Sequence, residues 1–340
     1  MKAVVWKGPF ELSLEDVPRP RPSKGEVLIK TKAVGVCGSD LEVYEGRFKQ
    51  SKPPMILGHE GGGIVEETGP GVKSVERGSR AMVECVLRCG ACEFCRTGRY
   101  GLCESGRTIG MFGADGAYAE YFTAPAENCH PLPEWIGWAE AGLTDTLAGP
   151  IHGLKNVRVF PGGTAAVFGA GPAGLFFCAL LKEQGISMVY LVDVQAHRLK
   201  LGPHFGADQT IHALHEDTVR IIREDTGGRG VDLAIEAAGS EQALNEGLQV
   251  LRKGGYLLLY GVFGGRPVTV DVQPVQFYEY TVVGSCGLDY PAAIGFLGRN
   301  MARADLLVTH RFDLEQLVEA FSSGMIKNQR DGYIKGVVLF

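Results

Sequence analysis

A glycine-rich segment near the middle of the chain constrains the fold more than any other feature. Residues 169–174 read Gly-Ala-Gly-Pro-Ala-Gly, with an apolar strand pattern, Thr164–Phe168, directly before them and a helical pattern after them. In a strand–turn–helix unit, Gly169 permits the tight turn, Gly171 lets the backbone approach a pyrophosphate, and Gly174 lets helix and strand pack closely. The segment therefore predicts a dinucleotide site on a parallel sheet.

The residues around this segment refine the prediction. Pro172 and Ala173 open the helix, whose N-terminus offers free N–H groups and a positive dipole end to phosphates. Asp193 follows the next strand, nineteen residues after Gly174, where an acid can hydrogen-bond the ribose 2′-hydroxyl and repel a 2′-phosphate. We therefore expect NAD rather than NADP, with Arg198 packed near the adenosine. The alternative is a glycine-rich turn in an unrelated α/β sheet, with Asp193 as a helix N-cap.

Two kinds of pattern divide the chain near residue 145. Short strands bounded by glycines are expected before it, at Lys2–Trp6, Val27–Val36, Gly62–Glu67, Arg80–Val86 and Ala117–Phe122. Strands alternate with helices after it, with strands at Thr164–Phe168, Met188–Val192, Val231–Ile235, Tyr256–Tyr260 and Thr281–Val283, and helices at Pro172–Glu183 and Ala196–Phe205. A helix at Asp313–Ser323 and a strand at Gly336–Phe340 close the chain.

These patterns predict an α/β protein with two domains. A β-rich domain is expected at residues 1–149, with residues 289–340 returning to it because a terminal strand needs a sheet to join. A doubly wound parallel-sheet domain is expected at residues 150–288.

The composition excludes several classes of function. The net charge of −5 provides no basic field for nucleic acid or for an anionic membrane. The longest apolar stretches, Ala173–Leu181 and Tyr256–Phe263, are too short to span a bilayer, and the N-terminus lacks the apolar core of a signal peptide. We therefore expect a cytoplasmic protein without nucleic-acid or membrane partners.

Four cysteines lie close together in the first half of the chain. Cys89, Cys92, Cys95 and Cys103 have the spacing C-x2-C-x2-C-x7-C, and four thiolates can close a tetrahedral shell around a structural zinc ion. An iron–sulfur cluster is the alternative, but the seven-residue spacing and the absence of a proline after Cys103 fit it poorly. The total of nine cysteines is odd and argues against a disulfide framework.

A second group of metal-ligand types lies upstream. Cys37 follows Gly35-Val36, and His59 and Glu60 stand between Gly58 and Gly61. A catalytic zinc needs about three protein ligands and one open position, and these residue types are suitable donors. A buried structural Cys and His is an equally good interpretation of the residues alone. Cys85 has no motif around it and is expected to be structural.

Taken together, the motifs resemble those of the zinc-containing medium-chain dehydrogenases. The Gly-Val-Cys-Gly-Ser-Asp and Gly-His-Glu segments, the four-cysteine lobe and the glycine fingerprint occur in that order and spacing over essentially the whole chain. The polyol (sorbitol-like), butanediol and threonine dehydrogenase branches are the most similar. The resemblance implies a GroES-like catalytic domain, a Rossmann domain, NAD, two zinc ions per chain, a small secondary alcohol as substrate and a homotetramer or homodimer.

The resemblance also implies roles for individual residues. Cys37 and His59 would be catalytic zinc ligands, and Glu60 a ligand that exchanges with substrate or water. Ser39 would accept the hydroxyl proton of the alcohol. Asp145 stands where polyol enzymes have a Glu-Pro-Leu-Ala carboxylate, and it could bind zinc directly, bind through water or steer a ligand. Its alternative interpretation is a helix N-cap.

Two departures from the family pattern bear on the substrate. Glu42 replaces a histidine found in many relatives, which suits a cationic or amino-bearing substrate, although a solvated helix residue explains it equally well. The segment Gly284–Tyr290 lacks the arginine of sorbitol-type enzymes, which disfavours sorbitol. A threonine 3-dehydrogenase-like activity is the main alternative. A quinone or alkene reductase, or a non-enzymatic nucleotide-binding protein, fits less well because both metal-ligand groups are present.

Overall fold

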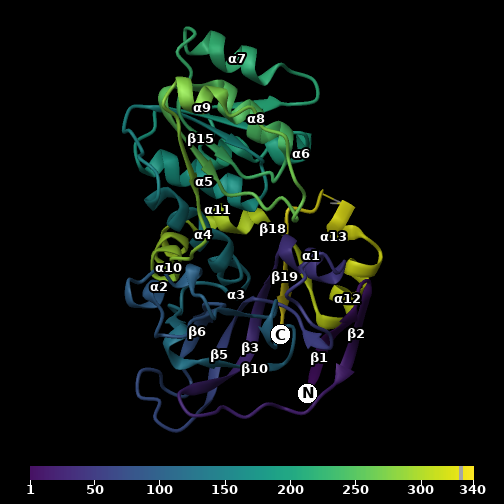
Figure 1. The fold of residues 1–340 in the computed structure, drawn as a ribbon. Helices are drawn as coiled ribbons and strands as arrows, with labels where there is room; N and C mark the ends of the chain where they lie inside the picture. Colours follow the sequence, from purple (N-terminus) through teal and green to yellow (C-terminus); the bar gives the residue numbers. More distant parts are fainter. Residues whose placement is uncertain (329–331) are drawn as a thin grey trace. The chain divides into compact units, whose positions relative to one another are not determined.

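Strands far apart in the sequence pair within two separate units of the computed structural model, which describes residues 1–328 and 332–340 (Figure 1). The first unit comprises Met1–Ala148 and Leu288–Phe340, and the second comprises Gly149–Gly287. Helix α4 (Thr144–Lys155) begins in the first unit and ends in the second. The chain is thus an α/β protein.

The second unit is built on one parallel sheet. Its strands run in the order β14-β13-β12-β15-β16-β17, which is the doubly wound order of a Rossmann fold. The strands are β12 (Thr164–Phe168), β13 (Met188–Asp193), β14 (Gln209–His212), β15 (Val231–Glu236), β16 (Leu251–Leu259) and β17 (Thr281–Gly284). The order reverses between β12 and β15, so a crevice is expected outside their carboxyl ends.

Helices connect these strands. They are α5 (Pro172–Glu183), α6 (Ala196–Leu199), η3 (Gly202–Phe205), α7 (Thr218–Asp225), α8 (Glu241–Val250) and α9 (Gln273–Phe277). Leu244 and Leu248 of α8 belong to the same buried apolar cluster as Phe168 and Val192 of the sheet. This apolar packing fixes the strand that carries the glycine segment.

The expected elements of the second unit match closely, with one correction. Strand β12 and helix α5 have the predicted bounds. The helix expected at Ala196–Phe205 is interrupted, however, and separates into α6 and η3. The physical reason is Pro203, which has no backbone N–H to donate and disfavours helical geometry at Gly202.

The first unit combines several small sheets. The main one has the order β11-β6-β5-β3-β19-β18, with β10 also paired to β3, and two further sheets have the orders β2-β1-β4 and β7-β8-β9. The strands are β1 (Lys2–Gly8), β2 (Glu11–Asp16), β3 (Glu26–Val36), β4 (Met55–Ile56), β5 (Glu60–Thr68), β6 (Arg80–Val83), β7 (Val86–Leu87), β8 (Arg107–Ile109), β9 (Gly113–Ala114), β10 (Tyr121–Pro125), β11 (Cys129–Pro131), β18 (Val308–Phe312) and β19 (Lys335–Leu339).

Short helices complete this unit. They are α1 (Gly38–Tyr44), α2 (Glu93–Arg96), η1 (Tyr100–Leu102), η2 (Ala126–Asn128), α3 (Trp138–Ala141), α10 (Tyr290–Arg299), α11 (Met301–Leu307), α12 (Leu314–Ser322) and α13 (Met325–Asn328). In the part of the chain that the structure describes, no helix combines the length and the apolar character needed to cross a bilayer.

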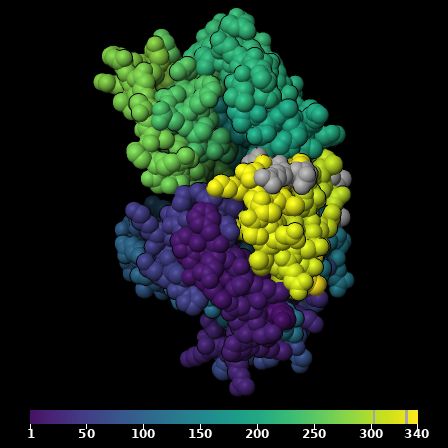
Figure 2. Space-filling view, turned by 90° about the vertical axis from the view of Figure 1, so that its right-hand side faces the viewer, coloured from purple at the N-terminus to yellow at the C-terminus, as the bar shows by residue number. Residues whose placement is uncertain are grey.

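The two ends of the chain meet in this first unit. Strand β19 pairs antiparallel with β3, with Gly336 opposite Val36, directly before Cys37. Figure 2 shows the C-terminal segment, in yellow, lying against the purple N-terminal strands. The C-terminal strand therefore supports the segment that carries the first cysteine motif.

Two sequence expectations for this unit are corrected. The strand expected at Ala117–Phe122 starts only at Tyr121, because the backbone of Tyr118 bonds instead to Val4 and Leu57. The strand expected at Arg80–Val86 ends at Val83, and the chain then turns into β7.

Candidate metal centres and dinucleotide site

The four-cysteine lobe forms a closed set of sulfur ligands. Helix α2 and η1 bring Cys89, Cys92, Cys95 and Cys103 together, with all four Sγ atoms within 4.8 Å of one another. Two sulfur pairs, Cys89–Cys95 and Cys92–Cys103, lie 3.8 Å and 4.0 Å apart. A tetrahedral zinc site with Zn–S bonds of about 2.3 Å requires sulfur separations of roughly 3.8 Å, so the lobe fits zinc.

Backbone N–H groups support thiolates in this lobe. Ala91 and Cys92 donate to the Cys89 sulfur, and these bonds lower the pKa of the Cys89 thiol to about 6. Burial acts in the opposite direction on Cys95 and raises its pKa to about 12. A zinc ion would supply the positive charge that the buried Cys95 thiolate needs.

The second ligand group is assembled by strand pairing. Cys37 is the N-cap of α1 at the end of β3, while His59 directly precedes β5 and Glu60 begins it. Gly35 of β3 pairs with Glu60 of β5. As a result, the ligand atoms of Cys37, His59 and Glu60 all lie within 4.8 Å of one another. Sulfur, imidazole and carboxylate donors are the set that a catalytic zinc uses.

Asp40 orients this group, and the sequence prediction did not include it. Its Oδ1 lies 3.0 Å from Nδ1 of His59, so the other ring nitrogen, Nε2, faces the ligand group. Its Oδ2 accepts hydrogen bonds from the backbone N–H of Cys37 (2.9 Å) and from the hydroxyl of Tyr118 (2.7 Å). Burial lowers the pKa of His59, but the negative charges of Asp40 and Cys37 outweigh it and raise that pKa well above its usual value.

Glu60 has an ion-pair partner from the far end of the chain. Nζ of Lys335 lies 2.5 Å from Oε2 of Glu60, and the hydroxyl of Thr146 donates to Oε1 at 3.1 Å. Both charged side chains are buried. Lys335 thus places a cation beside one of the three ligand candidates, Glu60.

Asp145 lies outside the ligand group. It is the second residue of α4 rather than the residue before it, so it is not an N-cap. Its Oδ2 accepts hydrogen bonds from the hydroxyl of Tyr290 (2.8 Å) and from the thiol of Cys85 (3.6 Å). Burial, together with the charge of Glu60, raises the pKa of Asp145 to about 6. Tyr290 and Cys85 therefore hold the Asp145 carboxylate in place by donating hydrogen bonds to it.

Ser39 and Glu42 project from the helix that follows Cys37. Oγ of Ser39 lies 3.4 Å from Nε2 of His59, beside the ligand group. Glu42 is held instead by two hydrogen bonds of 2.7 Å from the guanidinium of Arg47. This neutralisation weakens the hypothesis that Glu42 binds a cationic substrate.

The glycine segment has the close contacts that its sequence predicts. A Cβ on Gly169 would lie 2.9 Å from the backbone of Ala237 and Ala238, and a Cβ on Gly174 would collide with the Gly169 carbonyl. Gly171 is the N-cap of α5, with Pro172 and Ala173 in the first turn. The segment therefore needs glycine at 169 and 174.

Asp193 and Arg198 both lie at this segment. The Asp193 carboxylate accepts hydrogen bonds from the backbone N–H groups of Ala170 (2.6 Å) and Gln195 (2.7 Å). The N-cap of α6 is Gln195, so Asp193 is not that cap. A guanidinium nitrogen of Arg198 lies 3.6 Å from the position of a Cβ on Gly171. Both charged groups therefore adjoin the loop expected to hold the pyrophosphate.

A cavity of about 290 Å³ opens beside the loop. Its walls include Gly169, Asp193, Ala238, Ser240 and Glu246. Glu246 belongs to α8, and the other four residues end or follow β12, β13 and β15, at the carboxyl edge where a doubly wound sheet binds dinucleotides. This cavity lies where such a sheet would place the adenosine half of the ligand.

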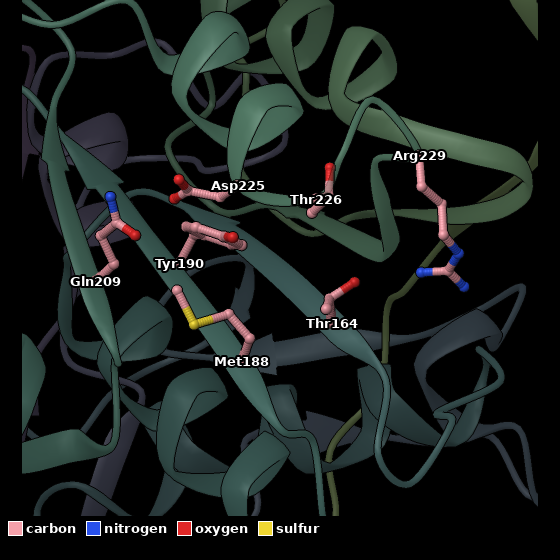
Figure 3. Close-up of a pocket in the computed structure, with 7 residues that line it drawn as sticks. All are labelled: Thr164, Met188, Tyr190, Gln209, Asp225, Thr226 and Arg229. Atoms are coloured by element: carbon pink, nitrogen blue, oxygen red, sulfur yellow. The ribbon is translucent and has the colours of Figure 1, made fainter.

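A second cavity of the same unit lies at the opposite edge of the sheet. It measures about 600 Å³ and is lined by residues at or near the amino ends of β12, β13 and β14 and after α7, including Thr164, Tyr190, Gln209 and Arg229 (Figure 3). Parallel sheets of this kind bind ligands at their carboxyl edge, so we assign this cavity no role in cofactor binding.

A local sequence motif marks Asp40 as a residue of this site, but none marks Lys335. Asp40 follows Cys37 in a short motif, so its position was a usable signal. Lys335 is 275 residues from Glu60, and no local pattern marks it. Only the pairing of β19 with β3 brings Lys335 to the site.

Comparisons with known proteins cover nearly the whole chain. The alcohol dehydrogenase GroES-like domain matches residues 23–134, and the zinc-binding dehydrogenase family matches residues 172–299. A sorbitol dehydrogenase of Bacillus subtilis is 33% identical over 97% of this chain and 95% of its own length. An L-threonine 3-dehydrogenase of Pyrococcus horikoshii is 36% identical over 92% of this chain and 90% of its own. The structure of an Escherichia coli protein described as a short chain alcohol dehydrogenase, complexed with NADH, has a TM-score of 0.92 and 28% identity, covering 100% of this chain and 99% of that one.

Proposed function

The chain belongs to the zinc-containing medium-chain alcohol and polyol dehydrogenases, and we propose that it transfers hydride from a small secondary alcohol to NAD at the Cys37, His59 and Glu60 group. The observation that carries the proposal is the convergence of these three ligand types within 4.8 Å of one another. In the reaction, the alcohol carbon loses a hydride and its hydroxyl loses a proton, giving a ketone, NADH and a proton.

The residues of the chain have distinct parts in this proposal. Cys37, His59 and Glu60 would hold the zinc ion, which would supply Lewis acidity toward the alcohol oxygen, and NAD at the glycine loop would supply the hydride acceptor. Asp40 holds the His59 ring so that Nε2 faces the metal position. Ser39 lies beside that nitrogen; its Oγ accepts the hydroxyl proton by hydrogen bond while its own proton passes outward through ribose hydroxyls or water. Asp145, held by Tyr290 and Cys85 and close enough to Glu60 to feel its charge, is the further carboxylate of the site: it binds the zinc directly, binds it through water or steers a ligand.

The proposed cofactor is NAD rather than NADP. The Asp193 carboxylate stands at the glycine loop, where its charge repels a 2′-phosphate. The E. coli structure holds NADH and a similar structure from Sinorhizobium meliloti (29% identical, TM-score 0.92) holds NADP, so the choice between the two cofactors rests on Asp193.

The proposed substrate class is a polyol, cyclitol, diol or amino alcohol. Relatives named for sorbitol and for L-threonine support this range. Because Arg47 neutralises Glu42, polyols, cyclitols and diols are favoured over amino alcohols. Threonine 3-dehydrogenase-like activity remains the second candidate, supported by the P. horikoshii relative.

The deciding experiment is NADH formation by zinc-replete enzyme. Sugar alcohols, inositols, vicinal diols, threonine and amino alcohols would be tested with NAD and NADP in parallel. Turnover of one alcohol class with NAD is the expected result. Turnover of only quinones or activated alkenes, or dinucleotide binding without any turnover in a protein with two zinc ions, would contradict the proposal.

We further propose that the protein acts as a homo-oligomer in the cytoplasm. Strand β17 is an edge strand of its sheet, and Val282 on it and Phe277 nearby are exposed. A two-fold copy can pair with such an edge. Light scattering should show a dimer or tetramer, and Val282→Lys should reduce its size; an unchanged assembly would argue against this edge. The thiolate lobe supports a reducing compartment.

A further inference from the structure

Glu236 is a buried carboxylate at the carboxyl end of β15, and none of the roles above uses it. Its Oε1 accepts hydrogen bonds from three consecutive backbone N–H groups, those of Ala238 (3.0 Å), Gly239 (2.7 Å) and Ser240 (3.3 Å). Its backbone carbonyl accepts from Tyr260 and Gly261, both at 2.9 Å. One residue therefore ties together the turns that follow β15 and β16.

Burial of the second side-chain oxygen of Glu236 costs folding free energy. Oε2 is buried and has no hydrogen-bond partner among the described residues. Burial raises the pKa of Glu236 in spite of the N–H donors. An apolar side chain would fill the same space without burying an unsatisfied oxygen, so packing alone does not explain a carboxylate here.

The turn that Glu236 holds forms part of the dinucleotide site. A Cβ on Gly169 would lie 2.9 Å from the backbone of Ala237 and Ala238, so this turn packs directly against the first glycine of the fingerprint. Ala238 and Ser240 also line the cavity that contains Gly169 and Asp193. Strands β12 and β15 are neighbours at the point where the strand order reverses.

The turn after β16 adds a second constraint. A Cβ on Gly261 would lie 2.5 Å from Oε2 of Glu236, and one on Gly239 would collide with the carbonyl of Val262. The two turns are thus packed against each other, with the carboxylate between them. Loss of the carboxylate would release the N–H groups of residues 238–240 and free the wall of the cavity.

We propose that Glu236 is a positioning residue for the dinucleotide, which holds the turn Ala237–Ser240 against Gly169 and so preforms the wall of the adenosine cavity. The inference rests on the proposed function, because it assumes that NAD(H) binds at the glycine loop. Its ligand class is a dinucleotide, and its effect is on cofactor affinity rather than on the metal centre.

The test compares side chains of similar size with and without an acceptor oxygen. Glu236→Met fills the space but cannot accept the three N–H bonds, whereas Glu236→Gln retains one acceptor oxygen. NADH binding to the zinc-loaded protein would be titrated by fluorescence. We expect the Kd of Glu236→Met to rise by about tenfold and that of Glu236→Gln to stay within roughly threefold of the wild type.

The chain offers a matched control on the same strand. Asp232, at the amino end of β15, is also buried and bonded to Arg229, Arg252 and the N–H of Thr164. Asp232→Asn should lower the melting temperature and leave the NADH Kd unchanged. If it weakens NADH binding as much as Glu236→Met does, the effect is general destabilisation and the inference is wrong.

Two further outcomes separate the possibilities. A native Kd in Glu236→Met would overturn the positioning role while leaving the proposed function intact, whereas a wild type that fails to bind NADH would overturn the proposed function itself. If Glu236→Met does not fold, Glu236→Asp makes the same comparison, because its carboxylate is one methylene too short to reach the turn. A native Kd in that variant would equally contradict the inference.

Discussion

Lys335 and Glu60 form a buried ion pair, with Nζ of the lysine 2.5 Å from Oε2 of the glutamate, although the two residues are 275 positions apart in the chain. The pair joins the last strand of the protein to the start of β5. Since Glu60 is one of the three converging ligand candidates, the C-terminal strand contributes directly to the electrostatics of the metal centre.

Removal of this lysine should be strongly destabilising. Lys335→Met leaves the Glu60 charge buried without its cation, which costs about 3–5 kcal/mol of unfolding free energy. Thermal unfolding of protein stripped of zinc by a chelator would measure the loss, because bound zinc would itself neutralise Glu60. The double variant Lys335→Met with Glu60→Gln should recover part of it, because no unpaired charge remains. A single variant as stable as the wild type would show that the pair has no net effect.

Asp40→Asn should weaken zinc binding at the catalytic group. Asn has lost the charge that supports the Nδ1–H of His59, and loss of such a carboxylate partner typically costs 10–100-fold, about the range expected here. Chelator competition would measure it. The four-cysteine lobe serves as the internal control, since its zinc should be retained. Equal loss from both sites would point to unfolding instead.

Loss of a ligand from the four-cysteine lobe should lower the stability of the protein without affecting its cofactor binding. Cys92→Ser removes one of four sulfur ligands, so the zinc content is expected to fall from about two ions per chain to about one, with a lower melting temperature. Metal analysis would check the stoichiometry, and NADH titration should show unchanged binding. Cys178→Ala, a buried thiol in α5 outside both groups, is the control that should keep both ions.

Acid stability should depend on Asp232. Burial raises its pKa, but hydrogen bonds from Arg229 and Arg252 outweigh it and hold that pKa well below its usual value. A carboxylate with a depressed folded-state pKa stabilises the protein above its unfolded pKa of about 3.9, and the contribution is lost as the pH falls further. The stability difference between wild type and Asp232→Asn, followed by urea unfolding, should therefore shrink below about pH 4. A difference that is constant with pH would contradict this assignment.

Cofactor choice should shift in Asp193→Asn. The amide keeps an acceptor for the backbone N–H of Ala170 but no longer repels a 2′-phosphate. We expect the preference for NAD over NADP to fall by roughly tenfold, as measured by the ratio of their kcat/KM values. Asp208→Asn is the matched control, since Asp208 accepts a backbone N–H from Val189 away from the loop. An unchanged ratio in Asp193→Asn would exclude its ribose role.

Several features of the protein were determined by the sequence alone. The glycine fingerprint, with its preceding strand, predicted β12, α5 and the Rossmann class because each glycine meets a local steric requirement. The C-x2-C-x2-C-x7-C spacing likewise predicted a structural zinc site with four thiolate ligands, since four ligands within fifteen residues can meet without help from distant segments. Local sequence patterns thus predicted those elements that are determined by interactions between residues close together in the chain.

Tertiary structure decided the surroundings of the ligand group. The ion pair of Lys335, the hydrogen bonds of Tyr290 and Cys85 to Asp145, and the neutralisation of Glu42 all depend on which segments fold against each other. The proposed positioning role of Glu236 likewise depends on the pairing of β15 with β12. Sequence spacing reports contacts within a strand or a helix, whereas burial and long-range pairing set the charge environment of a site, and these depend on the whole fold.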